Sequence, residues 1–127
     1  MKILIELPTW LGDAVMTSPA INTLISHFEE VELTIIGSQV SLEVMDNHPQ
    51  IVNSRLLNKN ILSQYFFARE IGGFDYFFSF RNSPRSKILK FFIRSKNKFQ
   101  FEKRKYQNTH QVEKYNSFID ASLGLKT

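Results

Sequence analysis

The sequence predicts an α/β fold of the Rossmann-like type, in which a parallel β-sheet carries helices on both faces. Two observations predict it. Short apolar runs typical of buried strands alternate with helix-length segments over the whole chain, and turns rich in glycine or polar residues separate them. At 127 residues the chain has the size of one ordinary domain, so residues 1–127 are expected to form a single unit.

The first strand and the first helical region are predicted from a change of spacing. Residues 1–7 form a short apolar run, which Pro8 stops because proline has a fixed φ and no N–H to donate. From Asp13 onwards, apolar residues recur at offsets of three and four, as on one face of a helix. Pro19 is expected near a helix start, with Ser18 as the cap.

The later elements continue the alternation of strand and helix. The second strand runs into Gly37-Ser38, and Gly72-Gly73 ends a helix in the usual way before an aromatic-rich strand. The full set of later predictions is a strand at 31–36, a short helix at 40–46, a strand at 51–56, a helix at 61–71, a strand at 74–80, a basic helix at 84–94, a strand at 99–101, and a helix at 109–123 closed by Gly124.

Composition narrows the setting in which the chain works. It contains no cysteine, which excludes disulfides and thiolate metal sites and suits a reducing compartment. The apolar run Ile3-Leu4-Ile5 is broken at once by Glu6, so it is too short for the core of a signal peptide. No segment approaches the roughly 20 apolar residues needed to span a bilayer. We therefore expect a cytoplasmic protein.

Charge is distributed very unevenly along the chain. Residues 1–80 carry four Lys or Arg against nine Asp or Glu, a net charge of −5, whereas residues 81–105 carry ten against one, a net charge of +9. The last 22 residues balance at zero, which recovers the overall +4. A field of one sign concentrated in one stretch indicates an anionic partner such as phosphate, nucleic acid or a membrane surface.

The segment Leu7 to Asp13 follows the first strand, and ligands of open parallel sheets bind beyond the carboxyl ends of strands. Spacing alone leaves two interpretations open. In the structural one, Gly12 serves a tight turn and Asp13 caps a helix. In the catalytic one, Asp13 is a general base that faces a cleft. The helix macrodipole counts against the second, because it stabilises the carboxylate and lowers its basicity.

The run Lys2 to Ala20, with the sequence KILIELPTWLGDAVMTSPA, resembles the opening of the ADP-heptose:lipopolysaccharide heptosyltransferases, especially those that add the second heptose. Three later segments keep the register of this resemblance. They are the strand that ends in Gly37-Ser38, the Phe74-Asp75-Tyr76 strand that leads into Asn82-Ser83-Pro84-Arg85-Ser86, and His110-Gln111-Val112-Glu113-Lys114-Tyr115 on the last helix.

The resemblance implies a GT-B enzyme of glycosyltransferase family 9 with two Rossmann-like domains, of which this chain is the amino-terminal, acceptor-binding half. It implies an inverting transfer of heptose from ADP-heptose to an inner-core sugar, with Asp13 as general base and no metal or other cofactor. Complete members hold the ADP-heptose in a second, carboxy-terminal domain. Because this chain stops about where the interdomain linker would begin, we expect it to be inactive alone.

The same edge of the sheet is expected to bind the acceptor, an anionic glycolipid of the lipopolysaccharide inner core. Arg85 is the main candidate, because a planar guanidinium binds a phosphate or a sugar carboxylate bidentately. The full set of acceptor-binding candidates is Thr9, Trp10, Gly12, Ser38, Arg81, Asn82, Ser83 and Arg85. The basic stretch also suits the anionic surface of the inner membrane that presents such a glycolipid, so peripheral contact at its inner face is expected.

Several features have plainer interpretations. His27, His48 and His110 lack the spacing of metal ligands and are expected to be structural or surface residues. The run Tyr65-Phe66-Phe67 is expected to pack in the core, with a membrane-facing patch as the alternative. Lysines of the basic stretch are expected mainly to solvate an exposed helix.

Two other functions compete with the heptosyltransferase. A nucleic-acid-binding module is suggested by the aromatic residues of the basic stretch, Phe91, Phe92, Phe99 and Phe101. We instead expect these residues to be core residues of a helix and a strand, and no recognised nucleic-acid motif is present, so no nucleic acid is expected as partner. A nucleotide-binding domain is disfavoured because the first turn lacks the G-x-G-x-x-G pattern.

Overall fold

The computed structural model describes residues 1–28, 30–45, 51–56, 60–101 and 111–124. Within them lies a five-stranded parallel sheet with strand order β3-β2-β1-β4-β5. The elements are β1 (Lys2–Glu6), α1 (Leu11–Met16), α2 (Ser18–His27), β2 (Glu32–Gly37), α3 (Gln39–Met45), β3 (Ile51–Leu56), α4 (Ile61–Ile71), β4 (Gly73–Ser79), α5 (Pro84–Phe92), β5 (Arg94–Gln100) and α6 (Gln111–Leu123).

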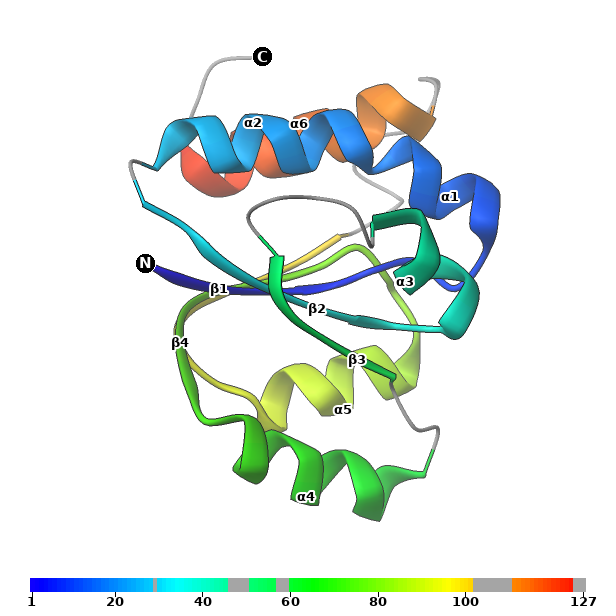
Figure 1. The fold of residues 1–127 in the computed structure, drawn as a ribbon, viewed down its shortest axis with the longest axis vertical. Coiled ribbons are helices and arrows are strands. Elements are labelled where there is room, and N and C mark those ends of the chain that lie inside the picture. Colours follow the sequence, from blue (N-terminus) through cyan, green and yellow to red (C-terminus); the bar gives the residue numbers. More distant parts are fainter. Residues whose placement is uncertain (29, 46–50, 57–59, 102–110, 125–127) are drawn as a thin grey trace.

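The helices cover both faces of this sheet, which confirms the predicted fold class (Figure 1). Helices α1, α2 and α6 lie over one face, and α4 and α5 lie over the other. The chain passes from β1 to β2 and β3 on one side and then returns to β4 and β5 on the other side of β1. The strand order therefore reverses between β1 and β4, and such a switch point is where open α/β sheets bind their ligands.

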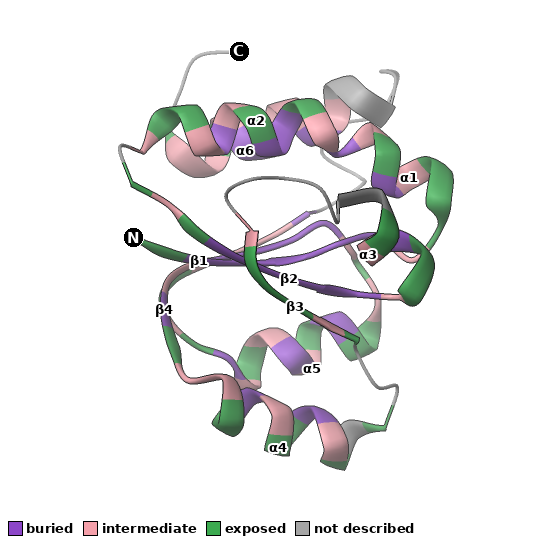
Figure 2. Ribbon diagram, viewed as in Figure 1, coloured by how far each residue is buried: buried purple, intermediate pink, exposed green. Residues whose placement is uncertain are grey.

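The core consists of two clusters, one on each face of the sheet (Figure 2). Side chains alternate along β1, so Ile3 and Ile5 join the cluster under α2 and α6, whereas Leu4 joins the cluster above α4 and α5. Aromatic rings fill the first cluster near α6, among them those of Phe78, Phe80, Phe101, Tyr115 and Phe118. Among the described residues, no helix combines the length and apolar character needed to cross a membrane.

The first helical region is divided into two helices. α1 ends at Met16 and α2 begins at Ser18, so Ser18 is the first residue of α2, and the prediction that it is the cap was wrong. Thr17 occupies the cap position, and its hydroxyl donates to the carbonyl oxygen of Ala14 at 2.6 Å. Pro19 lies in the first turn of α2, as predicted.

The basic region also departs from prediction. α5 ends at Phe92, and β5 begins at Arg94, five residues before the predicted strand. The polar residues of β5 conceal the strand in the sequence, because it lies at the edge of the sheet and only part of it faces the core. Predictions that involve His48, His110 and the start of the last helix at 109 fall outside the described residues.

Two aromatic predictions were wrong. Phe91 was expected in the core but is 81% exposed, and Tyr65 and Phe66 are 38% and 59% exposed. Only Phe67 of the Tyr65-Phe66-Phe67 run packs against a core cluster. The cause is that α4 and α5 each bury one side and turn these rings outwards.

Candidate functional site

The carboxyl ends of β1, β2 and β4 bring three loops to one edge of the sheet. The backbone pairing continues beyond the strands: the N–H of Leu7 donates to Ile36 at 2.9 Å, and the N–H of Phe80 donates to Glu6 at 3.0 Å. The loop after β1 therefore lies between the loops after β2 and β4. All the predicted site residues fall in these loops or in the first turns of α1 and α5.

Asp13 is the third residue of α1, and Trp10 occupies the cap position in extended conformation. The Asp13 side chain is partly buried, and its carboxylate makes no hydrogen bond or ion pair with any other described residue. The structural interpretation, in which Asp13 caps the helix, is therefore wrong. The carboxylate lies at the site edge in the first turn of α1, where its interaction with the helix macrodipole is its remaining contribution to the fold.

Gly12 is the second residue of α1, not part of a left-handed turn. A Cβ added there would meet no atom within 4 Å. The expectation that Gly12 serves a tight turn is therefore also wrong. Together with Trp10, which is 74% exposed, it leaves an open approach to the backbone beside Asp13.

Two serines after β2 hold the loop that carries Thr9. The Ser38 hydroxyl donates to the Thr9 carbonyl at 2.8 Å and lies 3.0 Å from the Ser41 hydroxyl. Ser41, which is buried, donates to the carbonyl oxygen of Pro8. Ser38 was predicted to bind the acceptor, and its hydroxyl here positions the neighbouring loop. Ser41 was not among the predicted site residues.

Glu6 is the most unusual residue at this edge, and it was also missed. It is the last residue of β1 and is fully buried. Its carboxylate accepts hydrogen bonds from the hydroxyls of Ser79 at 2.6 Å and Ser86 at 3.3 Å, and lies 3.6 Å from the guanidinium of Arg81. It thus joins β1, β4 and the first turn of α5. The signal in the sequence was the charge that interrupts the apolar run of β1.

Burial raises the pKa of Glu6 above its ordinary value of 4.5, because the carboxylate loses its water. The hydrogen bond from Ser79, the charge of Arg81 and the hydrogen bond from Ser86 oppose this shift without cancelling it. Raised pKa values occur at functional sites and in buried structural networks alike, and the contacts of Glu6 with β4 and α5 make it part of the network that holds this edge of the sheet.

The loop after β4 carries the four remaining predicted residues in different roles. Arg81 is partly buried and paired with Glu6, and its carbonyl oxygen accepts from Gln100 at 3.2 Å. The Ser83 hydroxyl caps α5 by accepting from the N–H of Ser86 at 3.2 Å. Asn82 and Arg85 are exposed. Arg85 makes no ion pair with a described residue, so its guanidinium is free to bind an anion.

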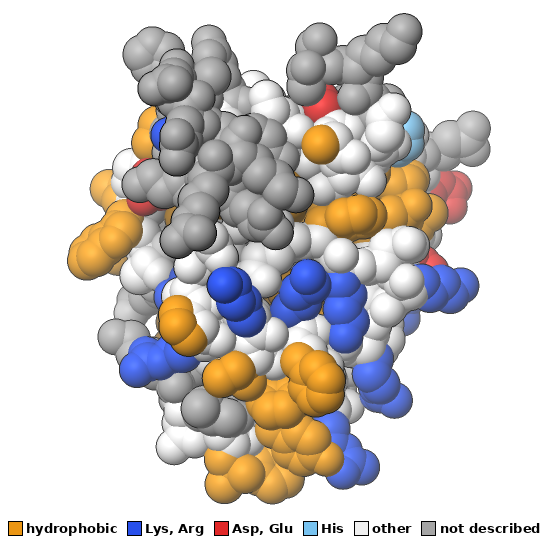
Figure 3. All heavy atoms as spheres, turned by 180° about the vertical axis from the view of Figure 1, so that it is seen from behind, with side chains coloured by type: hydrophobic (Ala, Val, Ile, Leu, Met, Phe, Trp, Pro, Cys, Tyr) orange, Lys and Arg blue, Asp and Glu red, His pale blue; other side chains and the backbone are white. Residues whose placement is uncertain are grey.

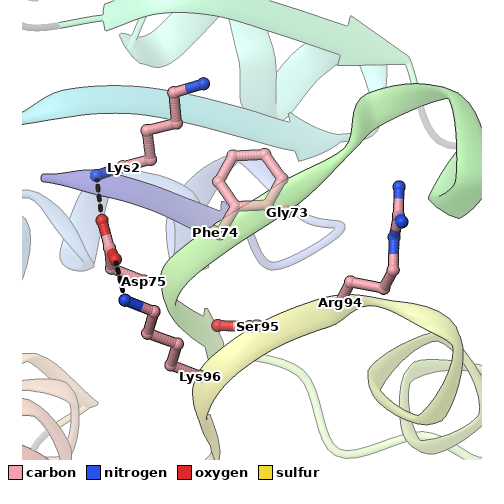
Figure 4. A pocket seen from close by; sticks show the side chains of 7 residues that line it. All are labelled: Lys2, Gly73, Phe74, Asp75, Arg94, Ser95 and Lys96. Atoms are coloured by element: carbon pink, nitrogen blue, oxygen red, sulfur yellow. Dashed lines mark hydrogen bonds and ion pairs between the residues drawn. The ribbon is translucent and has the colours of Figure 1, made fainter.

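A hollow of about 450 Å³ lies at the opposite edge of the sheet, at the amino ends of β1, β4 and β5. Figure 4 shows Asp75 there between the backbone of Lys2 and the side chain of Lys96. The hydrogen bond from Lys2, with the charge of Lys96, lowers the pKa of Asp75. This hollow contains none of the predicted site residues, and open parallel sheets bind their ligands at the other edge.

No family model matches the chain. It is 42% identical over 99% of its length to lipooligosaccharide heptosyltransferase 2 of Campylobacter jejuni serotype O:2, and 40% identical to the protein of the same name from serotype O:6. The chain spans 40% of the length of each of these relatives.

Three solved structures share the fold. The E. coli heptosyltransferase WaaC with ADP-2-deoxy-2-fluoro heptose matches 99% of the chain and 49% of its own, with a TM-score of 0.82 at 12% identity. A family 9 glycosyl transferase from Veillonella parvula matches 98% and 41%, with a TM-score of 0.80 at 18% identity. E. coli ADP-heptose lps heptosyltransferase II matches 94% and 40%, with a TM-score of 0.71 at 15% identity.

Over nearly its whole length the chain is therefore related in sequence to the lipooligosaccharide heptosyltransferases and shares the fold of the heptosyltransferase structures, while it corresponds to only part of those proteins.

Proposed function

We propose that the chain is the acceptor-binding half of a heptosyltransferase, which together with a second domain transfers heptose from ADP-heptose to the lipopolysaccharide inner core. The observation that carries the proposal is the 42% identity to a lipooligosaccharide heptosyltransferase over 99% of the chain. The loops after β1 and β4 meet at the switch point of the sheet, which supports a ligand site there.

Asp13 is the general base of this proposal. Its carboxylate accepts the proton of the acceptor hydroxyl while the hydroxyl oxygen bonds to the anomeric carbon of the heptose. The bond from that carbon to the phosphate oxygen of ADP breaks, ADP leaves, and the configuration inverts. A partly buried carboxylate with no partner among the described residues is suited to this step, because it is free to accept a proton.

We call the loops after β1 and β4 the acceptor loops. They supply the positive charge that an anionic acceptor requires. Arg85 binds an anionic group of the acceptor, and Arg81, which is paired with Glu6 in the same loop region, is its weaker partner. Such an acceptor is a glycolipid, so we place the protein in the cytoplasm, at the inner face of the inner membrane. We further propose that residues 1–127 form one domain and that a separate domain of the full enzyme holds ADP-heptose; the 40% of the relatives' length that this chain spans leaves room for such a domain.

A chimera tests the proposal. The matching 40% of the Campylobacter jejuni heptosyltransferase 2 is replaced by this chain, and transfer from ADP-heptose to inner-core acceptor is measured. We expect heptosyl transfer above that of the remaining part of the enzyme alone. A folded chimera that binds neither acceptor nor donor, or binds both without transfer, contradicts the proposal.

A further inference from the structure

We propose that the surface formed by α4 and α5 docks onto an anionic lipid bilayer. Four hydrophobic side chains on these helices face outwards: Leu62 is 63% exposed, Tyr65 38%, Phe66 59% and Phe91 81%. We call these four residues, three of them aromatic and one aliphatic, the aromatic patch. Exposed apolar groups of this size gathered in one place mark an interaction surface.

The aromatic patch is continuous across the two helices. The ring of Tyr65 on α4 lies 5.7 Å from that of Phe66 and 5.3 Å from that of Phe92 on α5, and Phe92 lies 6.0 Å from Phe91. Phe92 is partly buried and anchors the exposed rings to the core. Figure 3 shows the hydrophobic side chains gathered at the end of the molecule that α4 and α5 form.

Positive charge borders the aromatic patch. Residues 84–101 of α5 and β5 contain six Lys or Arg and no Asp or Glu. Figure 3 shows Lys and Arg side chains above and beside the hydrophobic end. Of these six, only Lys96 forms an ion pair with a described residue, namely Asp75.

Two of these cations lie close enough to disturb each other. Burial and the charge of Lys90 together lower the pKa of Lys98. On α4, Arg69 lies over the ring of Tyr65, with its guanidinium carbon 5.8 Å from the ring centre. Five of the six cations of α5 and β5 have no ion pair with a described residue, so this side of the aromatic patch carries an excess of positive charge, which favours an anionic partner.

Aromatic rings beside Lys and Arg form the combination that binds an anionic membrane surface, because the rings enter the interface while the cations meet the lipid phosphates. The inference rests on the proposed function in one respect: a glycolipid acceptor is held in such a membrane. Helices α4 and α5 both begin at the site edge, so docking through them sets the acceptor loops beside the lipid headgroups.

Vesicle co-sedimentation of the 127-residue chain tests the proposal. We expect binding to vesicles of phosphatidylglycerol and phosphatidylcholine, little binding to phosphatidylcholine alone, and loss of binding as salt is raised to about 0.5 M. Phe66→Ser with Phe91→Ser should weaken binding about tenfold or more, because two exposed rings no longer enter the lipid. The matched control, Val52→Ser with Leu56→Ser on β3, removes two side chains of similar exposure, each 64%, and should retain binding.

Three results would overturn the docking surface: equal binding to both kinds of vesicle, full binding by the Phe66 and Phe91 variant, or a dimer in sedimentation velocity that this variant dissociates. The last result would assign the patch to a second copy of the chain. Failure of the proposed function is distinguishable, because it shows as an inactive chimera while vesicle binding persists. Failure of the docking surface alone leaves the chimera active on a soluble, deacylated acceptor.

Discussion

Asp13 contributes little to the fold, since its carboxylate has no partner among the described residues and Trp10 holds the cap position of α1. In the chimera, Asp13→Asn is expected to lower kcat by about 10²-fold or more, because the amide keeps the shape of the side chain but accepts no proton. Acceptor affinity and the unfolding temperature should change little. A variant with nearly full kcat and reduced thermal stability would return Asp13 to a structural role.

Arg85 carries the same charge as Lys87, but it lies in the first turn of α5, at the candidate site. Arg85→Glu should weaken acceptor binding by about tenfold or more, since a charge-assisted bidentate contact is lost and a repulsive charge is added. The KM for ADP-heptose should stay the same. Lys87→Glu makes the same type of change two residues along α5 and is the control. Equal effects of both variants on a soluble acceptor would indicate a general charge effect rather than a binding site.

Glu6 links stability to pH in a direction unusual for a carboxylate. Because its pKa is raised in the folded state, the folded chain holds this proton more tightly than the unfolded chain. The stability that the proton contributes is complete below the unfolded pKa of about 4.5 and is lost as pH rises through the folded pKa. Glu6→Gln removes this titration while it keeps the shape of the side chain.

We therefore expect Glu6→Gln to gain stability relative to the parent as pH rises above the unfolded pKa of about 4.5 and through the raised folded pKa, by at most about 1.4 kcal/mol per pH unit. Urea unfolding at each pH measures the difference. Glu43→Gln, which changes an exposed carboxylate on α3, should show no such trend. A difference for Glu6→Gln that grows towards acid pH would mean that the sign of the shift is wrong.

At the scale of elements, α1 is short and its second residue is glycine, which weakens it. Gly12→Ala is expected to leave stability unchanged or raise it by up to about 1 kcal/mol, because the site is open and the backbone is not left-handed. Acceptor affinity of the chimera should fall, since the methyl group occupies the approach beside Asp13.

Gly37→Ala provides the contrast for this prediction. The added Cβ would lie 3.3 Å from the Cβ of Leu7, where β2 ends against the loop after β1. Thermal unfolding should show a loss of about 1 kcal/mol or more, as expected for overpacking. If Gly12→Ala were the more destabilising of the two, the glycine in α1 would serve the fold rather than the ligand.

The elements also show what the sequence can and cannot predict. Hydrophobic spacing identified β1, β2 and β4, because these strands are buried and nearly continuous in apolar residues. It missed the start of β5, because the residues from Arg94 to Lys98 lie at the sheet edge and are polar. Phe66 and Phe91 were assigned to the core because hydrophobicity alone does not tell which side of a helix is covered by a neighbour.

The candidate site was predictable to a similar extent. The resemblance of residues 2–20 to a known family pointed to Asp13 and its loop, and the structure places that loop at the switch point. The contacts of Glu6 with Ser79 and Ser86 join residues more than 70 positions apart, so only the fold reveals them. Ser83, by contrast, stands directly before Pro84 at the predicted start of a helix, a position typical of an N-cap, so its capping role was available from the sequence although it was assigned to acceptor binding.

At the scale of the whole molecule, the chain spans 40% of its curated relatives. If the nucleotide site belongs to the part that is not spanned, calorimetric titration of the chain with ADP should give no saturable heat up to about 1 mM. The chimera, which contains both halves, should bind ADP. Micromolar affinity of the chain alone would mean that its own loops bind nucleotide.

The place of β1 at the centre of the sheet affects how the chain is made. β1 precedes the other four strands of this sheet in the chain and so emerges from the ribosome before them, and Ile3 pairs on one side with Leu33 and on the other with Tyr76. Such pairing between distant parts of a chain slows folding, since long loops must close first. During synthesis, one edge of this apolar strand therefore stays unpaired until β4 has emerged, and in that interval it exposes the nascent chain to aggregation.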